Sequence, residues 1–165
     1  VKFMSDILII YYSYTGNSRK IAKYAEEKLN ADILELQPKI PFSDDYDKVV
    51  EEWQNNNIKR DVEIETFDKD LTNYKKIVLI TSTWWYGINP VMTRFLKEYD
   101  LSGKEIIVTA TNAGWIGHCF KDYKELLPNS NIKGELDIVF SSDREEKNNL
   151  LTSTHKIDEW LKKLS

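Results

Sequence analysis

Three runs of apolar residues without a charged side chain stand out along the chain. They cover residues 7–12 (ILIIYY), 77–80 (IVLI) and 106–110 (IIVTA). Runs of this kind are typical of strands that are buried on both faces of a parallel sheet. Residues 136–140 form a further strand-like run, and residues 32–36 alternate polar and apolar positions, as expected near a sheet edge. We therefore expect five strands.

Between these runs, apolar residues recur at the three- and four-residue spacing of amphipathic helices. The helical positions are Ile21, Ala22, Ala25 and Leu29; Tyr46, Val49, Val50 and Trp53; Met92, Phe95, Leu96 and Tyr99; Phe120, Tyr123 and Leu127; and Ile157, Trp160, Leu161 and Leu164. Asp44 or Asp45 is placed to cap the second helix, and Pro90 opens the third.

Strands that alternate with helices predict an α/β fold with helices on both faces of the sheet. We expect a three-layer, doubly wound, five-stranded parallel sheet in the order 2-1-3-4-5, with right-handed crossovers. The 165 residues, 41% of them hydrophobic, are enough for one sizeable core. The prediction is a single domain over residues 1–165.

The first apolar run leads into a loop rich in hydrogen-bonding side chains. Ser13, Thr15, Asn17 and Ser18 surround Gly16, and a helical pattern follows. Backbone N–H groups at a helix start lack internal partners and attract anions, so this loop can bind a phosphate. It lacks the glycine pattern of the Walker and dinucleotide loops, which favours a monophosphate. An ordinary capped turn is the alternative.

The other two apolar runs end in loops that carry aromatic residues. Trp84, Trp85 and Tyr86 are consecutive in the first of these loops, and Trp115 lies between Gly114 and Gly117 in the second. Adjacent rings at the carboxyl end of a strand favour a wall for a flat ligand. The alternative is that the rings pack onto a neighbouring helix. In the predicted strand order all three loops share one crevice.

The charge and cysteine content narrow the classes of partner. A net charge of -4 and a pI near 5.3 argue against binding to nucleic acid or to an anionic membrane. A single cysteine, Cys119, cannot form an internal disulfide, and no apolar segment approaches ~20 residues. We therefore expect a cytoplasmic protein with an electropositive protein partner.

The neighbours His118 and Cys119 suggest a thiol nucleophile with an imidazole base, since a helix start lowers a thiol pKa. No third, orienting group is visible in the sequence, so a buried cysteine is the simpler interpretation. His155 lies far along the chain, and no metal cluster is indicated.

The loops, taken together, resemble those of flavodoxins. Residues 13–18 (SYTGNS) are similar to the loop that binds the FMN phosphate, and residues 83–87 (TWWYG) and 112–117 (NAGWIG) are similar to the two loops that hold the flavin ring. The lack of a long interruption in residues 136–141 resembles the short-chain type. The resemblance implies FMN as cofactor and the following binding residues: Ser13, Tyr14, Thr15, Gly16, Asn17, Ser18, Ser82, Thr83, Trp84, Trp85, Tyr86, Gly87, Thr111, Asn112, Ala113, Gly114, Trp115 and Gly117.

One departure from the flavodoxin pattern concerns charge. Many flavodoxins surround the flavin with acidic residues, but residues 82–89 and 111–118 contain neither Asp nor Glu. The acids gather instead in residues 44–52 and 143–146. We therefore expect exclusion of water by the tryptophans to influence the flavin more than direct charge repulsion does.

The resemblance implies a monomeric electron carrier without a catalytic side chain. A flavoprotein reductase is the expected electron donor, and the acceptor is left open. One alternative is an NAD(P)H-dependent quinone or flavin reductase of the same fold, which needs room for a nicotinamide against the flavin. The other is a flavin-binding module without electron exchange. Closure of the ring by Trp115 and by Trp84 or Trp85 favours the carrier.

Overall fold

Five parallel strands form the centre of the molecule in a computed structural model that describes residues 5–55, 62–142 and 148–164. The strands are β1 (Ile7–Tyr11), β2 (Asp32–Glu35), β3 (Lys76–Trp84), β5 (Glu105–Asn112) and β6 (Asn131–Val139). Their order is β2-β1-β3-β5-β6. The predicted α/β fold and strand order are confirmed, with β2 at an edge of the sheet.

A short hairpin, which was not predicted, extends the sheet. Strand β4 (Gly87–Ile88) pairs antiparallel with the end of β3, where Thr83 lies opposite Ile88 and Trp84 opposite Gly87. The turn between them consists of Trp85 and Tyr86. The hairpin turn thus contains two of the three consecutive aromatic residues, while Trp84 belongs to β3 itself.

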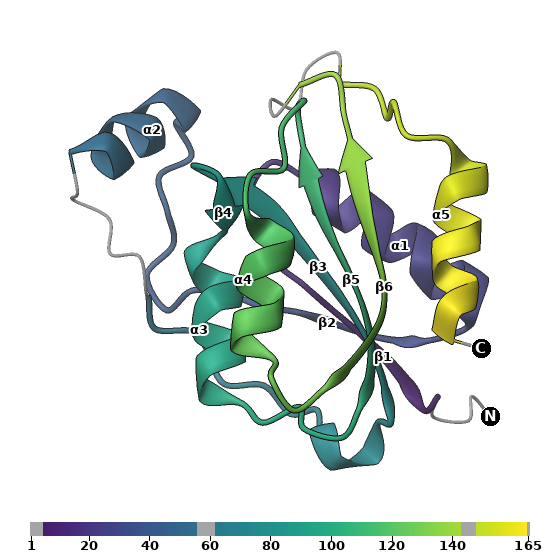
Figure 1. Cartoon of the computed structure of the whole chain (residues 1–165). Helices are drawn as coiled ribbons and strands as arrows, with labels where there is room; N and C mark the ends of the chain where they lie inside the picture. The colour runs from purple at the N-terminus through teal and green to yellow at the C-terminus, as the bar shows by residue number, and fades with distance from the viewer. Residues whose placement is uncertain (1–4, 56–61, 143–147, 165) are drawn as a thin grey trace.

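Helices cover both faces of the sheet, as Figure 1 shows. They are α1 (Asn17–Leu29), α3 (Pro90–Glu98), α4 (Cys119–Leu126) and α5 (Thr154–Leu161), with 3-10 turns at Leu71–Asn73 and Lys162–Leu164. Helices α1 and α5 lie on one face, and α3 and α4 on the other (Figure 1). A further helix, α2 (Tyr46–Gln54), stands apart from these layers near the end of β4 (Figure 1).

Alternate residues of each central strand belong to different halves of the core. Leu8 and Ile10 of β1 pack in the cluster that includes α3 and α4, whereas Ile9 and Tyr11 pack in the cluster that includes α1 and α5. This is the two-residue period of a strand that is covered on both faces. It explains why the first apolar run contains no charged residue.

None of the helices in the described part of the chain has the length and apolar character needed to cross a lipid bilayer.

Candidate ligand-binding site

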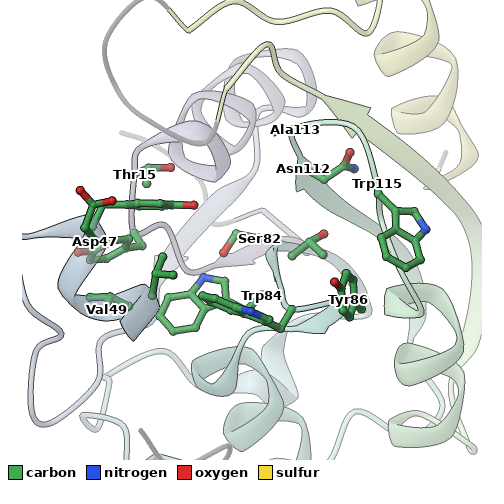
Figure 2. A pocket seen from close by; sticks show the side chains of 14 residues that line it. Thr15, Asp47, Val49, Ser82, Trp84, Tyr86, Asn112, Ala113 and Trp115 are labelled. Carbon is green, nitrogen blue, oxygen red and sulfur yellow. The ribbon is translucent and has the colours of Figure 1, made fainter. Parts of the chain in front are cut away.

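A cavity of about 490 Å³ opens at the carboxyl ends of β1, β3 and β5. Many of the predicted site residues line it: Tyr14, Thr15, Ser82, Thr83, Trp84, Trp85, Tyr86, Asn112, Ala113 and Trp115. Figure 2 shows Thr15 at one side of the cavity, Trp84 along its floor and Trp115 at the opposite side. The structure thus brings the three predicted loops together at one crevice. The lining does not include the other predicted residues, which are Ser13, Gly16, Asn17, Ser18, Gly87, Thr111, Gly114 and Gly117.

The amino-terminal end of α1 is left without a side-chain cap. Gly16 occupies the cap position with a positive φ of 100°, it makes no side-chain cap bond, and the first turn contains no acidic residue. Lys20 N donates to Gly16 O at 3.1 Å and begins the helical ladder, so the preceding amides have no intrahelical partner. Side chains of Asp45, Asn89 and Ser153 cap α2, α3 and α5, whereas α4, like α1, has no side-chain cap. The start of α1 therefore suits an anion.

Several polar side chains of this first loop are engaged within the protein. Ser13 Oγ accepts from Gly16 N at 3.0 Å, and the hydroxyls of Ser18 and Thr111 share a hydrogen bond of 3.0 Å. Asn17 Nδ2 donates to Ser142 O at 3.1 Å, and Asn17 Oδ1 accepts from Asn148. These side chains and the Gly16 amide hold the shape of the loop, while Thr15 lines the cavity, where its hydroxyl can contact a ligand. The sequence alone did not separate these two roles.

A buried asparagine orients the hydroxyl of Ser82. Asn89 Nδ2 donates to Thr81 Oγ1 at 2.7 Å and to Ser82 Oγ at 3.2 Å. Because Ser82 Oγ accepts this bond, its own proton is available to donate, and Ser82 lines the cavity. The site thus gains a hydroxyl donor from the end of β3.

The aromatic residues of the second loop divide into a buried and an exposed part. Trp84 is only 8% exposed and packs against Phe42 and Tyr14, with ring centroids 5.0 and 6.0 Å away. Tyr86 is 52% exposed and pairs with Trp115 at 4.4 Å between centroids. Trp84 therefore packs in the core and also lines the cavity, while Tyr86 and Trp115 form the open rim of the cavity.

Helix α2 supplies cavity residues that sequence reasoning missed. Tyr46, Asp47, Val49 and Val50 line the cavity, and Val49 is buried against Trp84. Figure 2 shows Asp47 and Val49 on the side nearest Thr15. The apolar spacing of Tyr46, Val49 and Val50 predicted a covered face, but not the surface that covers it.

The position of α2 also brings acidic residues to the site. Asp45 Oδ1 accepts from Asp47 N at 3.0 Å and caps the helix, as predicted for Asp44 or Asp45. Burial, with the negative charges of Asp44 and Asp45, raises the pKa of Tyr14, which donates to Ser43 O and stays neutral. Asp47 therefore places a carboxylate at the cavity that the sequence analysis did not anticipate, and the greater influence of water exclusion on the flavin stays a prediction. Acidic residues 143–146 lie outside the described residues.

Asn112 fixes the third loop. It is 3% exposed; its Oδ1 accepts from Gly114 N at 2.9 Å, and its Nδ2 donates to Asp137 Oδ1 at 2.5 Å. The loop then presents Ala113 and Trp115 to the cavity, and Trp115 remains 65% exposed. Gly114 has a φ of 140°, a backbone conformation that other residues rarely adopt.

Comparisons with known proteins agree with this arrangement. A family model described as flavodoxin matches residues 6–157. The chain belongs to the flavodoxin family. No curated protein matches it in sequence.

Solved flavoprotein structures share this flavodoxin-family fold. A protein from Bacteroides uniformis, described as a candidate flavoprotein, is 20% identical over 97% of this chain and 99% of its own, with a TM-score of 0.75. Its counterpart from Bacteroides eggerthii is 20% identical over 96% of both chains, with a TM-score of 0.73. A Lactobacillus acidophilus flavoprotein, solved in complex with FMN, is 21% identical over 79% of this chain and 91% of its own, with a TM-score of 0.65.

The geometry around Cys119 does not favour a nucleophile. The thiol is fully buried and lies 3.5 Å from Thr83 Oγ1, and burial raises its pKa to about 12. The His118 ring turns instead to Asp122, with Nδ1 2.8 Å from the carboxylate. The described residues contain no group of His, Cys, Asp and Glu side chains that is arranged to hold a metal ion.

Cys119 should consequently resist alkylation in the folded protein. Because the thiolate is the reactive form, we expect iodoacetamide at pH 8 to label native protein about a hundredfold or more slowly than protein unfolded in urea. Mass spectrometry of timed samples measures the two rates. Similar rates would place the thiol in contact with solvent and contradict its burial.

Proposed function

We propose that this flavodoxin-family chain binds FMN without a covalent bond and carries electrons between redox proteins. The observation that carries the proposal is a cavity that extends from Thr15, which directly precedes the uncapped start of α1, to aromatic residues on β3, on the loop after β5 and on α2. Such a cavity matches a ligand with a phosphate at one end and a flat ring at the other. The Lactobacillus acidophilus relative, whose structure contains FMN, supports the same ligand.

Each part of the cavity has a distinct role in this proposal. The first amides of α1 and the Thr15 hydroxyl receive the phosphate, and the Ser82 hydroxyl donates to the ligand beside it. Trp84, Tyr86 and Trp115 exclude water from the ring. Bound FMN would supply reversible electron transfer, which no amino-acid side chain of the site provides.

The exposed rim indicates where electrons enter and leave. Tyr86 and Trp115 lie at the mouth of the cavity and are both more than half exposed. A protein that docks over this rim approaches the ring closely, and the acidic residues of α2 favour a partner with positive charge. We propose a flavoprotein reductase as the donor.

Electron transfer from NADPH tests the proposed role against the reductase alternative. The FMN-loaded protein with NADPH and a quinone should show slow NADPH oxidation, followed at 340 nm. In a second, anaerobic mixture without quinone, NADPH and a catalytic amount of a ferredoxin–NADP⁺-type reductase should produce rapid bleaching of the FMN absorbance. Rapid NADPH oxidation by the protein alone would favour a stand-alone reductase, and no bleaching in either mixture would favour a binding module.

Neutralisation of Asp47 should raise the reduction potential of bound FMN. Reduction adds negative charge to the flavin, and Asp47 places a carboxylate at the cavity. The difference between Asp47→Asn and the parent should shrink as the Debye length falls from ~30 Å at 0.01 M salt to ~3 Å at 1 M. Potentiometric titration measures both values, with exposed Glu159→Gln as the control. A lower potential, or no change at low salt, would contradict a direct effect of Asp47.

A further inference from the structure

The turn that carries the aromatic residues rests on the start of α4. The backbone N–H of His118 donates to Tyr86 O at 2.6 Å. Gly117, with a φ of 61°, lies so close that a Cβ at its position would overlap the carbonyl group of Tyr86. The second and third cavity loops therefore touch through backbone atoms.

Asp122, on the first turn of α4, fixes the same hairpin from another direction. Its Oδ2 accepts from Ile88 N at 3.2 Å, and both of its oxygens lie 2.8 Å from Nδ1 of His118. A Cβ at Gly87 would lie 2.7 Å from His118 Cε1 and 2.8 Å from Asp122 Oδ2. Asp122 and His118 are thus packed directly against the β4 backbone, behind the cavity.

The turn is one that needs support. Trp85 and Tyr86 have φ values of 43° and 74°, and neither is a glycine. Side chains with a Cβ are disfavoured in this left-handed region and keep it only where the surroundings hold it. Both residues line the cavity, so the contacts that hold the turn also set the shape of the ligand site.

We propose that Asp122 is a positioning residue for the bound flavin. Through Ile88 and His118 it holds the Trp85–Tyr86 turn in its left-handed conformation and joins the second and third loops into one rigid wall. It acts on the ligand only through these neighbours, since it does not line the cavity. The identity of the ligand as FMN rests on the proposed function; the restraint on the turn is a property of the chain itself.

Substitutions on α4 separate positioning from other roles of Asp122. Asp122→Ala removes both acceptors and should weaken FMN binding by about tenfold or more, because the site loses its preorganised shape. Asp122→Asn keeps an acceptor for Ile88 N and a polar partner for His118, and should stay within about threefold of the parent. Glu125→Ala, which removes an exposed carboxylate paired with Lys121 on the same helix, should change nothing. Equal losses for Asp122→Ala and Asp122→Asn would assign the effect to charge at the helix start and overturn the proposal.

A pair of glycine variants tests the contact between loops independently of Asp122. Gly117→Ala and Gly103→Ala both place a Cβ at a residue with a positive φ, 61° and 78° respectively. The new Cβ would overlap Tyr86 at position 117, but it would meet no atom within 4 Å at position 103. Gly117→Ala should weaken FMN binding by about tenfold or more, whereas Gly103→Ala should leave it within about threefold. Equal affinities for these two variants would show that the loops do not act together.

Hydrogen exchange in the flavin-free protein keeps this inference separate from the proposed function. The amides of Ile88 and His118 should exchange at least about tenfold faster in Asp122→Ala than in the parent, while amides of β1 stay unchanged. Unchanged exchange rates at both amides would show that Asp122 does not hold the turn, whether or not FMN binds. If the parent protein fails to bind FMN, the proposed function fails, and the exchange result still decides whether Asp122 holds the turn.

Discussion

The chain should bind FMN about a thousandfold more tightly than riboflavin, a difference of ~4 kcal/mol. The two ligands share a ring and differ by a phosphate, which the start of α1 receives in the proposed site. Gly16 provides no side-chain cap, and no acidic residue occupies the first turn of the helix. Charge-assisted bonds from backbone amides contribute about 1.5–3 kcal/mol each, so two or three of them account for the difference.

Flavin fluorescence, quenched by the surrounding aromatic rings, provides the titration for both ligands. Equal affinities for FMN and riboflavin would show that the start of α1 does not bind the phosphate. Thr15→Val should narrow the gap between FMN and riboflavin by about tenfold, since it deletes one hydroxyl bond to the phosphate. Thr72→Val, at an exposed threonine of the Leu71–Asn73 turn, is the matched control and should leave both affinities unchanged.

The layered fold could be predicted because each central strand is recognisable in the sequence as an apolar run without charged residues. Residues 7–11 are apolar on both faces, since both faces are covered; charged Asp6 precedes the strand, and the hydroxyl-rich loop that begins at Ser13 follows it. Parallel order follows from the helical patterns between strands. The positions of the three ligand loops then follow from the fold, because all three continue from carboxyl ends of adjacent strands.

The hairpin at β4 could not be predicted from local signals. Turns with two positive φ values normally contain Asn or Gly, and this one contains Trp85 and Tyr86. The conformation depends on Gly117, His118 and Asp122, which lie some thirty residues further along the chain. Such a turn is specified by tertiary contacts rather than by its own residues.

The location of α2 was hidden for a related reason. The helical period of Tyr46, Val49 and Val50 indicates an apolar face, but any apolar surface could cover it. In the structure that surface is a small cluster around Trp84, which borders the main core through Phe42 and Tyr14. The partners of Asn17 were unpredictable for the same reason. Its side chain hydrogen-bonds to Ser142 and Asn148, which lie far along the chain, so from the sequence alone the Asn17 side chain looked available for a phosphate.

Trp84→Ala should lower the free energy of unfolding by about 3–5 kcal/mol and also weaken FMN binding by about tenfold or more. The indole fills the space between Val49, Phe42 and Tyr14, so its loss leaves a void under α2. Because Val49 of α2 packs in this cluster, loss of Trp84 should leave α2 without the contacts that hold it beside the cavity. Urea unfolding of the flavin-free protein gives the stability, and flavin fluorescence gives the affinity.

Phe95→Ala is the control that separates general destabilisation from damage to the site. Phe95 is fully buried on α3 beside Phe67 and Tyr99, it does not line the cavity, and its truncation should also lower the free energy of unfolding by about 3–5 kcal/mol. FMN at a hundred times its Kd adds ~2.7 kcal/mol of stability, so the end point of the titration is read on folded protein. Under these conditions Phe95→Ala should bind FMN within about threefold of the parent. If both variants lose affinity equally, the loss reflects stability alone and Trp84 has no separate role as a wall of the site; if only Trp84→Ala loses it, the cluster beneath α2 is part of the ligand site.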